Sequence, residues 1–199
     1  MKLTALGILK WNGDATPIFL GFASDVSNFG YFQRGAVKEG LNFLARTIVQ
    51  RTQPGQRQSV KTEGYMCHVQ VKDYGLAAIV VADQEYPVTA AFSIITKVID
   101  EYIELAGEGW KSVDTDATVA NTILEPAVAK YQDHTQADKL SKIQKDLDET
   151  KIILHQTIDS VLKRGEKLDA LVDKSNDLSL ASQMFYKQAK KANSCCTYM

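Results

Sequence analysis

The spacing of apolar residues divides this chain into two regions. In residues 1–131, short apolar runs are separated by glycine, proline and Asn-Gly punctuation, which is typical of strands and helices joined by tight turns. In residues 139–194, apolar residues recur at alternating intervals of three and four, which predicts one long amphipathic helix. The polar stretch between them, residues 132–138, is the predicted linker.

The first region has the sequence pattern of an α+β domain. The turn signal Asn12-Gly13-Asp14 joins two apolar runs, and Ser27 or Asn28 is placed to cap the helix that follows. This order predicts a five-stranded antiparallel sheet with helices on both faces. In chain order, the predicted elements are strands at 1–10 and 17–23, a helix at 27–50, strands at 58–63, 65–72 and 76–83, and helices at 88–106 and 121–130.

The helix predicted at 27–50 has two apolar stripes, although packing on a sheet requires only one. The first stripe consists of Val37, Leu41, Leu44 and Ile48. The second stripe either widens the core or lines a surface groove that could accept an amphipathic helix. Its members are Phe29, Phe32, Ala36, Gly40 and Phe43.

The second region carries a heptad seam, which requires partner helices. A continuous helix over residues 140–192 would be about 80 Å long. Because five seam positions are polar, the seam favours a hetero-assembly over a self-paired dimer. The apolar seam residues include Leu140, Ile143, Leu147, Leu154, Val161, Leu168, Leu171, Leu178 and Phe185, and the polar ones are Thr150, Thr157, Arg164, Ser175 and Ser182.

Arg164 lies in the middle of this seam, between Val161 and Leu168. An ionised guanidinium cannot enter an apolar layer without partners, except at large cost. It therefore either extends outward to solvent or meets a ring of amide or carboxylate acceptors from partner helices. In the second case this polar layer would fix the register of the assembly.

The chain ends with Cys195-Cys196-Thr197-Tyr198-Met199, which fits a prenylation signal with Cys196 as the modified residue. Methionine at the last position favours farnesyl, and Cys195 is placed for a palmitoyl group. The longest apolar run, residues 76–82, is far shorter than the ~20 residues of a spanning helix. The basic residues Lys187, Lys190 and Lys191 would place charge against an anionic leaflet.

Other features limit the possible functions. The net charge of −1 does not suggest a nucleic-acid partner, and the scattered histidines offer neither a metal site nor a catalytic base. Cys67 lies in an apolar stretch and is expected to be buried and inert. Neither a disulfide framework nor a signal peptide is evident, so a reducing cytosolic compartment is expected.

These motifs together resemble a known family. The heptad run with Arg164 at its centre resembles an R-SNARE, and the ββαβββαα region resembles a longin domain, which has a profilin-like fold. With the Cys-Cys tail, the chain is similar to lipid-anchored longin R-SNAREs. The resemblance implies a membrane fusion protein that is not an enzyme and has no cofactor beyond its lipids. Arg164 would meet glutamines from Qa, Qb and Qc SNAREs in a parallel four-helix bundle.

The resemblance and the chemistry also imply a location and a resting state. The protein would act on the cytoplasmic face of Golgi, ER-derived vesicle and endosome or vacuole membranes. An exposed lipid and seam would aggregate in the cytosol, so we expect a closed monomer. In this closed form the seam and lipid would pack on the groove, and the long helix would be broken near Gly165, the one glycine within it. The first region would thereby inhibit assembly.

Two other functional classes share features with this sequence. A prenylated small GTPase shares the tail, and Gly30 to Gly35 resembles a phosphate-binding loop, but Ala36 and Val37 stand where lysine and a hydroxyl residue are required. A longin-type trafficking adaptor or scaffold, which binds membranes without fusing them, remains the main alternative.

Overall fold

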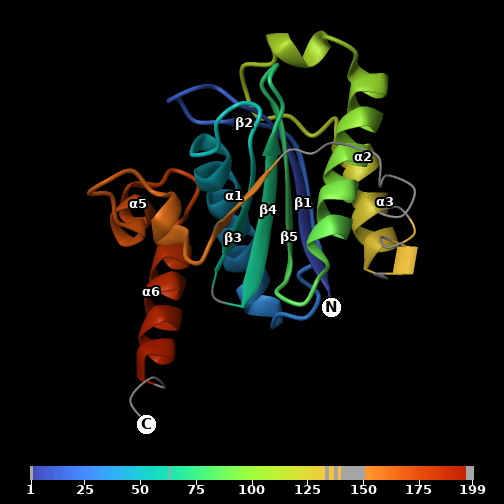
Figure 1. Ribbon diagram of the computed structural model, residues 1–199. Helices are drawn as coiled ribbons and strands as arrows, with labels where there is room; N and C mark the ends of the chain where they lie inside the picture. The colour runs from blue at the N-terminus through green and yellow to red at the C-terminus, as the bar shows by residue number, and fades with distance from the viewer. Residues whose placement is uncertain (1, 63, 133–134, 137–138, 140–150, 196–199) are drawn as a thin grey trace.

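A computed structural model describes residues 2–62, 64–132, 135–136, 139 and 151–195. The described residues form a six-stranded sheet in the order β2-β1-β5-β4-β3-β6, with helices on both faces (Figure 1). β6 pairs in parallel with β3, and every other neighbouring pair is antiparallel. The strands are β1 (Leu3–Lys10), β2 (Ile18–Ser24), β3 (Arg57–Lys61), β4 (Tyr65–Val71), β5 (Leu76–Asp83) and β6 (Ile152–His155).

Alternating side chains along the strands build a separate core on each face of the sheet. On one face α1 (Arg34–Gln50) packs through Leu41, Ala45 and Ile48. On the other face lie α2 (Val88–Ala106) and α3 (Asn121–Tyr131). Central strand β5 is buried on both faces, which explains its unbroken apolar sequence.

Most elements predicted in residues 1–131 are confirmed. The helix predicted at 88–106 has those bounds in α2, and α3 ends one residue beyond its prediction. The first helix is shorter than predicted, because α1 begins at Arg34 after the single 3-10 turn η1 (Tyr31–Gln33). Ser27 and Asn28 therefore do not cap it, and Gln33 occupies the N-cap position.

The continuous helix that the heptad pattern predicts is not formed in this unpartnered chain, whereas the break expected near Gly165 in a closed form is present. The described part of this region contains β6, η3 (Ile158–Val161), α5 (Leu168–Lys174) and α6 (Leu180–Cys195). Gly165 has a φ of +88°, in a left-handed turn between η3 and α5 that a helix cannot contain. Seam positions Leu140, Ile143, Leu147 and Thr150 lie outside the described residues.

The prediction of a five-stranded, wholly antiparallel sheet is also wrong, because part of the predicted long helix forms a sixth strand that pairs in parallel with β3. The sixth strand comes from Ile152–His155, which the heptad pattern assigned to helix. A lone amphipathic helix would leave its seam in water, whereas the broken chain buries part of the seam on the first region. Val161, for example, joins the apolar core beneath α1.

Candidate functional site: the docked C-terminal segment

The C-terminal segment, residues 151–195, lies along α1 and the β3 edge of the front domain, residues 2–131 (Figure 1). Seam residues Val161, Leu178 and Ser182 are buried in this arrangement. Leu168, Leu171 and Phe185 are half-buried. Docking therefore hides part of the surface that partner helices would need.

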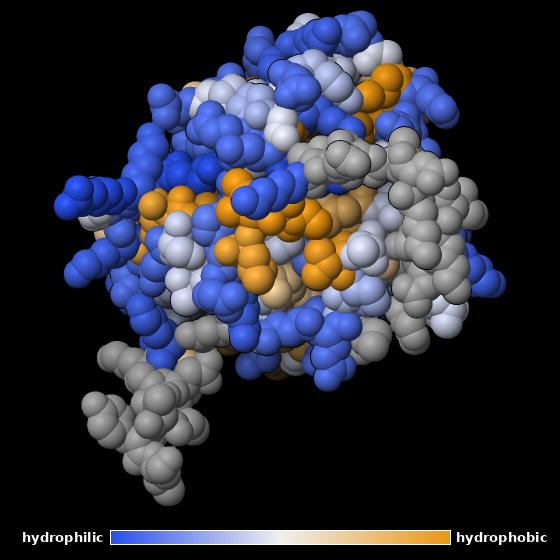
Figure 2. All heavy atoms as spheres, in the orientation of Figure 1, coloured by the Kyte–Doolittle hydropathy of each residue, from blue (hydrophilic) through white to orange (hydrophobic). Residues whose placement is uncertain are grey.

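Hydrogen bonds of the parallel β type attach the beginning of this segment to the sheet. Ile152 to His155 lie in register with residues 57–60 of β3. Ile153 is half-buried, whereas the seam residue Leu154 is 57% exposed. Figure 2 shows an apolar patch on this face of the molecule. Ile152 and Leu154 of β6, the edge strand beside β3, are both exposed. In β6 the exposed and half-buried residues thus alternate with a period of two.

Arg51, at the C-terminal end of α1, holds the turn around Arg164. Its Nη2 lies 3.0 Å from both carboxylate oxygens of Glu166, and its Nε donates to Oε2 at 3.3 Å. Glu166 also accepts a hydrogen bond from the Lys163 backbone N–H at 2.9 Å. Burial opposes ionisation of Glu166, but these hydrogen bonds and charges together lower its pKa. Lys163 in turn contacts Asp14 at 2.9 Å.

Arg46 joins three parts of the chain. Its guanidinium pairs with Asp116 in the loop before α3 and lies 3.4 Å from Asp177, between α5 and α6. It also covers the Phe19 ring of β2, 4.6 Å from the ring centroid. Burial raises the pKa of Asp177, and the Arg46 charge acts in the opposite direction. The segment is therefore held by two arginines, Arg46 and Arg51, from one helix.

Glu39 of α1 binds the start of α6. Its Oε2 accepts a hydrogen bond from the Ser179 backbone N–H at 2.7 Å. Hydrogen bonds from Ser179 and Ser182 lower the pKa of Glu39, so the carboxylate is ionised at neutral pH. An anionic acceptor at the first turn of a helix stabilises that turn through its free N–H groups.

The stripe predicted to line a groove is only partly covered. Phe29, Ala36, Gly40 and Phe43 are half-buried, which is compatible with a groove along α1. Phe32 is 96% exposed and contacts Tyr31 edge to face in η1. The assignment of Phe32 to a covered groove is therefore wrong in this conformation, because Phe32 lies in η1, before α1 begins at Arg34.

Arg164 itself is exposed in the docked form, where no described residue pairs with it. Its side chain is therefore available for a polar layer with partner helices. Cys196 and the residues after it lie outside the described residues, and the side chain of Cys195 is likewise not described.

Two basic residues near the C-terminus, Lys187 and Lys190, are paired in this conformation. Lys187 lies 2.7 Å from Asp173, and Lys190 lies 2.7 Å from Asp169. Both acids belong to α5, so α5 and α6 are joined by their charges. The packing of α5 against α6 therefore leaves Lys187 and Lys190 less available to an anionic leaflet than the sequence suggested.

Cys67 is fully buried on β4, as predicted, and burial raises the pKa of its thiol to about 12. A thiol this protonated is a poor nucleophile. The described residues contain no cluster of His, Cys, Asp and Glu placed to hold a metal ion. Among them, no helix combines the length and apolarity required to cross a membrane.

Sequence reasoning missed the docking residues Arg46, Arg51 and Glu39. Isolated charges on a helix are ordinarily solvated. The partners of these three residues in the C-terminal segment are Asp177, Glu166 and Ser179, which are distant in sequence and left no local signal. The strand β6 did leave one. Two consecutive β-branched residues, Ile152 and Ile153, favour strand more than helix.

Comparison with known proteins identifies the family. A longin model, described as a regulated-SNARE-like domain, matches residues 26–125, and the synaptobrevin family matches residues 139–197. VAMP-like protein YKT61 of Arabidopsis thaliana is 56% identical over 200 residues, covering 100% of both chains. Synaptobrevin homolog YKT6 of Debaryomyces hansenii and of Saccharomyces cerevisiae are 47% and 43% identical over 201 residues, again covering 100% of both chains.

The chain belongs to the longin-domain R-SNARE family. Its front domain is the longin domain, and its C-terminal segment is part of the SNARE region. It is a vesicle-trafficking protein of endomembranes and not an enzyme.

Proposed function

We propose that this R-SNARE drives membrane fusion and that the docked conformation is its autoinhibited form. In the active form, residues 140–192 would become one helix in a parallel bundle with Qa, Qb and Qc SNAREs. Arg164 would then lie among three glutamines, in the polar layer that fixes register. Burial of apolar layers would supply the work that brings two membranes together.

The observation that carries this proposal is the burial of seam residues against the longin domain. Val161 and Leu178 cannot be buried on the front domain and inside a four-helix bundle at the same time. Residues 152–155 also cannot be a β-strand and a helix together. Docking and bundle formation are therefore mutually exclusive, and partners shift the population from one to the other.

The lipids would complete the mechanism. A farnesyl group on Cys196 and a palmitoyl group on Cys195 would anchor the active protein, since two lipids hold a membrane far more firmly than one. The cytoplasmic faces of ER-derived vesicles, the Golgi and the endosome or vacuole are the expected membranes.

The test of fusion is reconstitution in liposomes. The doubly lipidated chain is placed on one set of liposomes, and Qa, Qb and Qc SNAREs are placed on another. We expect lipid and content mixing that stops when a soluble fragment of one Q-SNARE occupies the bundle. Stable tethering without content mixing would instead identify an adaptor.

The test of autoinhibition uses two phenylalanines close together in sequence. Phe43→Glu places a carboxylate on the half-buried stripe of α1 and should release the C-terminal segment. Phe32→Glu changes a side chain that is 96% exposed and serves as the matched control. Small-angle scattering should show an extended Phe43→Glu protein and a compact control. Equal dimensions for both variants and the wild type would contradict the closed form.

A further inference from the structure

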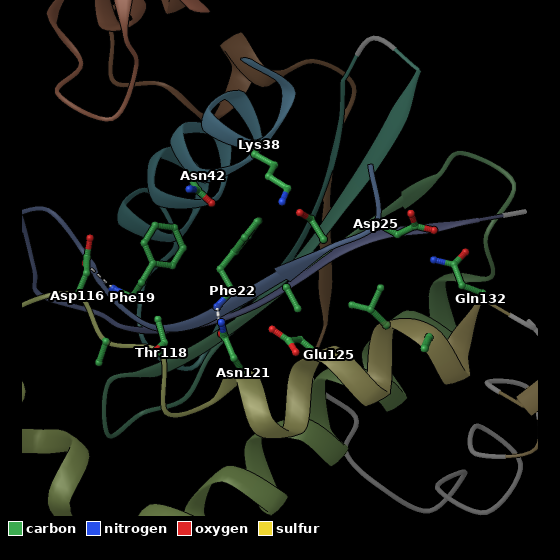
Figure 3. A pocket seen from close by; sticks show the side chains of 15 residues that line it. Phe19, Phe22, Asp25, Lys38, Asn42, Asp116, Thr118, Asn121, Glu125 and Gln132 are labelled. Atoms are coloured by element: carbon green, nitrogen blue, oxygen red, sulfur yellow. Dashed lines mark hydrogen bonds between the residues drawn. The ribbon is translucent and has the colours of Figure 1, made fainter. Parts of the chain in front are cut away.

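A groove of about 650 Å³ lies over the outer edge of β2 (Figure 3). β2 and β6 are the two opposite edge strands of the sheet. β2 forms its floor, α1 forms one wall and α3 forms the other. The lining positions on α3 include Asn121, Glu125 and Val128, which recur at helical spacing along one face. The described residues that line the groove end at Gln132, and all of them belong to the longin domain or the residue that follows it.

The first half of the β2 edge is already covered by the chain itself. The Ala117 and Ala120 N–H groups donate to the carbonyls of Phe19 and Leu20, at 2.7 and 3.0 Å. The side chain of Asp116 accepts from the Phe19 N–H at 3.0 Å. This part of the edge cannot accept another strand.

The second half of the edge is open. The Phe22 N–H donates outward, to Asn121 Oδ1 at 2.8 Å, so Phe22 faces away from β1. Ser24, two residues later in the same antiparallel pairing, faces the same way. Among the described residues, the outward carbonyl of Phe22 and the backbone groups of Ser24 have no hydrogen-bonding partner. They form a short template for an added strand.

The two walls carry opposite charges that no described residue compensates. Lys38 extends from α1 and Glu125 from α3, on opposite sides of β2 (Figure 3). The other carboxylates of the groove are already paired, Asp25 with Lys2 at 3.3 Å and Asp116 with Arg46. Asn42, on the same wall as Lys38, has a buried side-chain oxygen without a described partner. The groove therefore offers one cation, one anion and one acceptor.

We propose that this groove binds an extended peptide of a partner protein as a short strand added to the open end of β2. Successive side chains of a strand point to opposite faces of a sheet, and here these faces are the α1 and α3 walls. A peptide with adjacent acidic and basic residues would place its carboxylate near Lys38 and its cation near Glu125. The small side chains of Ala23 and Ala129 leave room for the backbone.

The charge pattern favours a peptide over a membrane surface. An anionic leaflet would be attracted by Lys38 but repelled by Glu125, and a flat surface cannot reach backbone groups on a groove floor. Strand addition satisfies those backbone groups directly and uses the side chains for specificity. Because the described part of the SNARE region does not line the groove, a partner could bind the docked and the bundled forms alike.

The test uses the full-length chain labelled with ¹⁵N and the capped peptide Thr-Val-Asp-Lys-Val-Thr. The control peptide, Thr-Asp-Val-Lys-Val-Thr, has the same composition but directs its acid and base toward one wall. We expect the first peptide to shift the amide resonance of Ser24 and its neighbours, and to bind about tenfold more tightly than the control. Amides of β6, at the far edge of the sheet, should not move.

Charge reversal separates specific pairing from general attraction. Lys38→Glu and Glu125→Lys should each weaken binding of the first peptide about tenfold. The double reversal should instead prefer the peptide with acid and base exchanged, Thr-Val-Lys-Asp-Val-Thr, over the first peptide. Equal affinity for the two peptides, or single reversals without effect, would overturn the proposal. So would shifts of the groove amides by anionic phosphatidylserine vesicles instead of the peptide, which would indicate a membrane-binding surface.

Discussion

Arg51 and Glu166 form a bidentate ion pair between the end of the longin helix α1 and the turn that carries Arg164. The guanidinium is nearly buried and the carboxylate is about one-quarter exposed, so solvent screens this pair only in part. Glu166 is two residues beyond the seam position Arg164 and is not itself a seam residue. The pair therefore stabilises only the docked form.

Glu166→Gln should weaken docking by about 1 kcal/mol without changing the assembled bundle. The amide cannot pair with the Arg51 charge, whereas the seam residues are untouched. Stopped-flow assembly with Q-SNAREs should become several-fold faster, and thermal melting of the finished bundle should be unchanged. Glu104→Gln on α2 is the control. If assembly rates match the wild type, the pair does not limit opening.

Ile153 and Leu154 should have opposite roles in the two forms. Ile153 is half-buried in β6 and off the seam, whereas Leu154 is a seam residue that the docked form leaves exposed. Ile153→Gln should therefore speed hydrogen exchange of the β3 amides and leave the bundle intact. Leu154→Gln should lower the melting temperature of the bundle and leave β3 protected. The two variants are each other's control, and the same effect from both would refute the distinction.

Arg164→Leu should change partner choice more than stability. Replacing a buried ionic group by an apolar one is often neutral or stabilising, by up to about 4 kcal/mol. The docked form should be unaffected, because Arg164 is exposed there. Competition among Q-SNAREs should show lost selectivity, with the exposed Lys167→Leu as control. Unchanged selectivity would place Arg164 in solvent in both forms.

Removing the two tail cysteines should have graded effects. Cys195→Ser leaves one lipid, which gives reversible membrane binding, and Cys196→Ser should leave the protein soluble. Cys67→Ala changes a buried thiol and should not affect membrane binding. Flotation of each lipidated variant with liposomes measures the fraction of protein that is bound to membranes. Full flotation of Cys196→Ser would refute the assignment of the anchor.

His68 should make the longin domain sensitive to acid. It is buried on β4, where Nδ1 lies 2.8 Å from Ser59 Oγ, and burial lowers its pKa from 6.5 to about 4. The unfolded chain binds a proton at higher pH than the folded chain. The free energy of unfolding should therefore fall as pH drops from 6.5 to 4, by about 1.4 kcal/mol per unit.

Chemical denaturation at several pH values tests this expectation. His68→Asn keeps a polar group near Ser59 but cannot titrate, so its unfolding free energy should depend less on pH over this range. The comparison uses the slope rather than the absolute stability, which the substitution itself changes. Equal slopes for the variant and the wild type would show that other groups cause the acid sensitivity.

Local sequence determined most of the longin domain. The periodicity of residues 88–106 defines α2 because its apolar face has one surface to cover, the sheet. The apolar run of β5 and the glycine turns around it likewise leave few alternatives. The start of α1 was less certain, because Ser27 and Asn28 are good caps that the fold does not use.

Tertiary structure alone decided the conformation of the C-terminal segment. Residues 152–155 fit a heptad helix and a β-strand, and the seam pattern by itself favours the helix. With no partner helices, the surface that can bury Val161 and Leu178 is the longin domain, and its open β3 edge satisfies the backbone of β6. The sequence thus determined which residues must be buried. The surface available to cover them decided whether the segment forms a strand with short helices or one long helix.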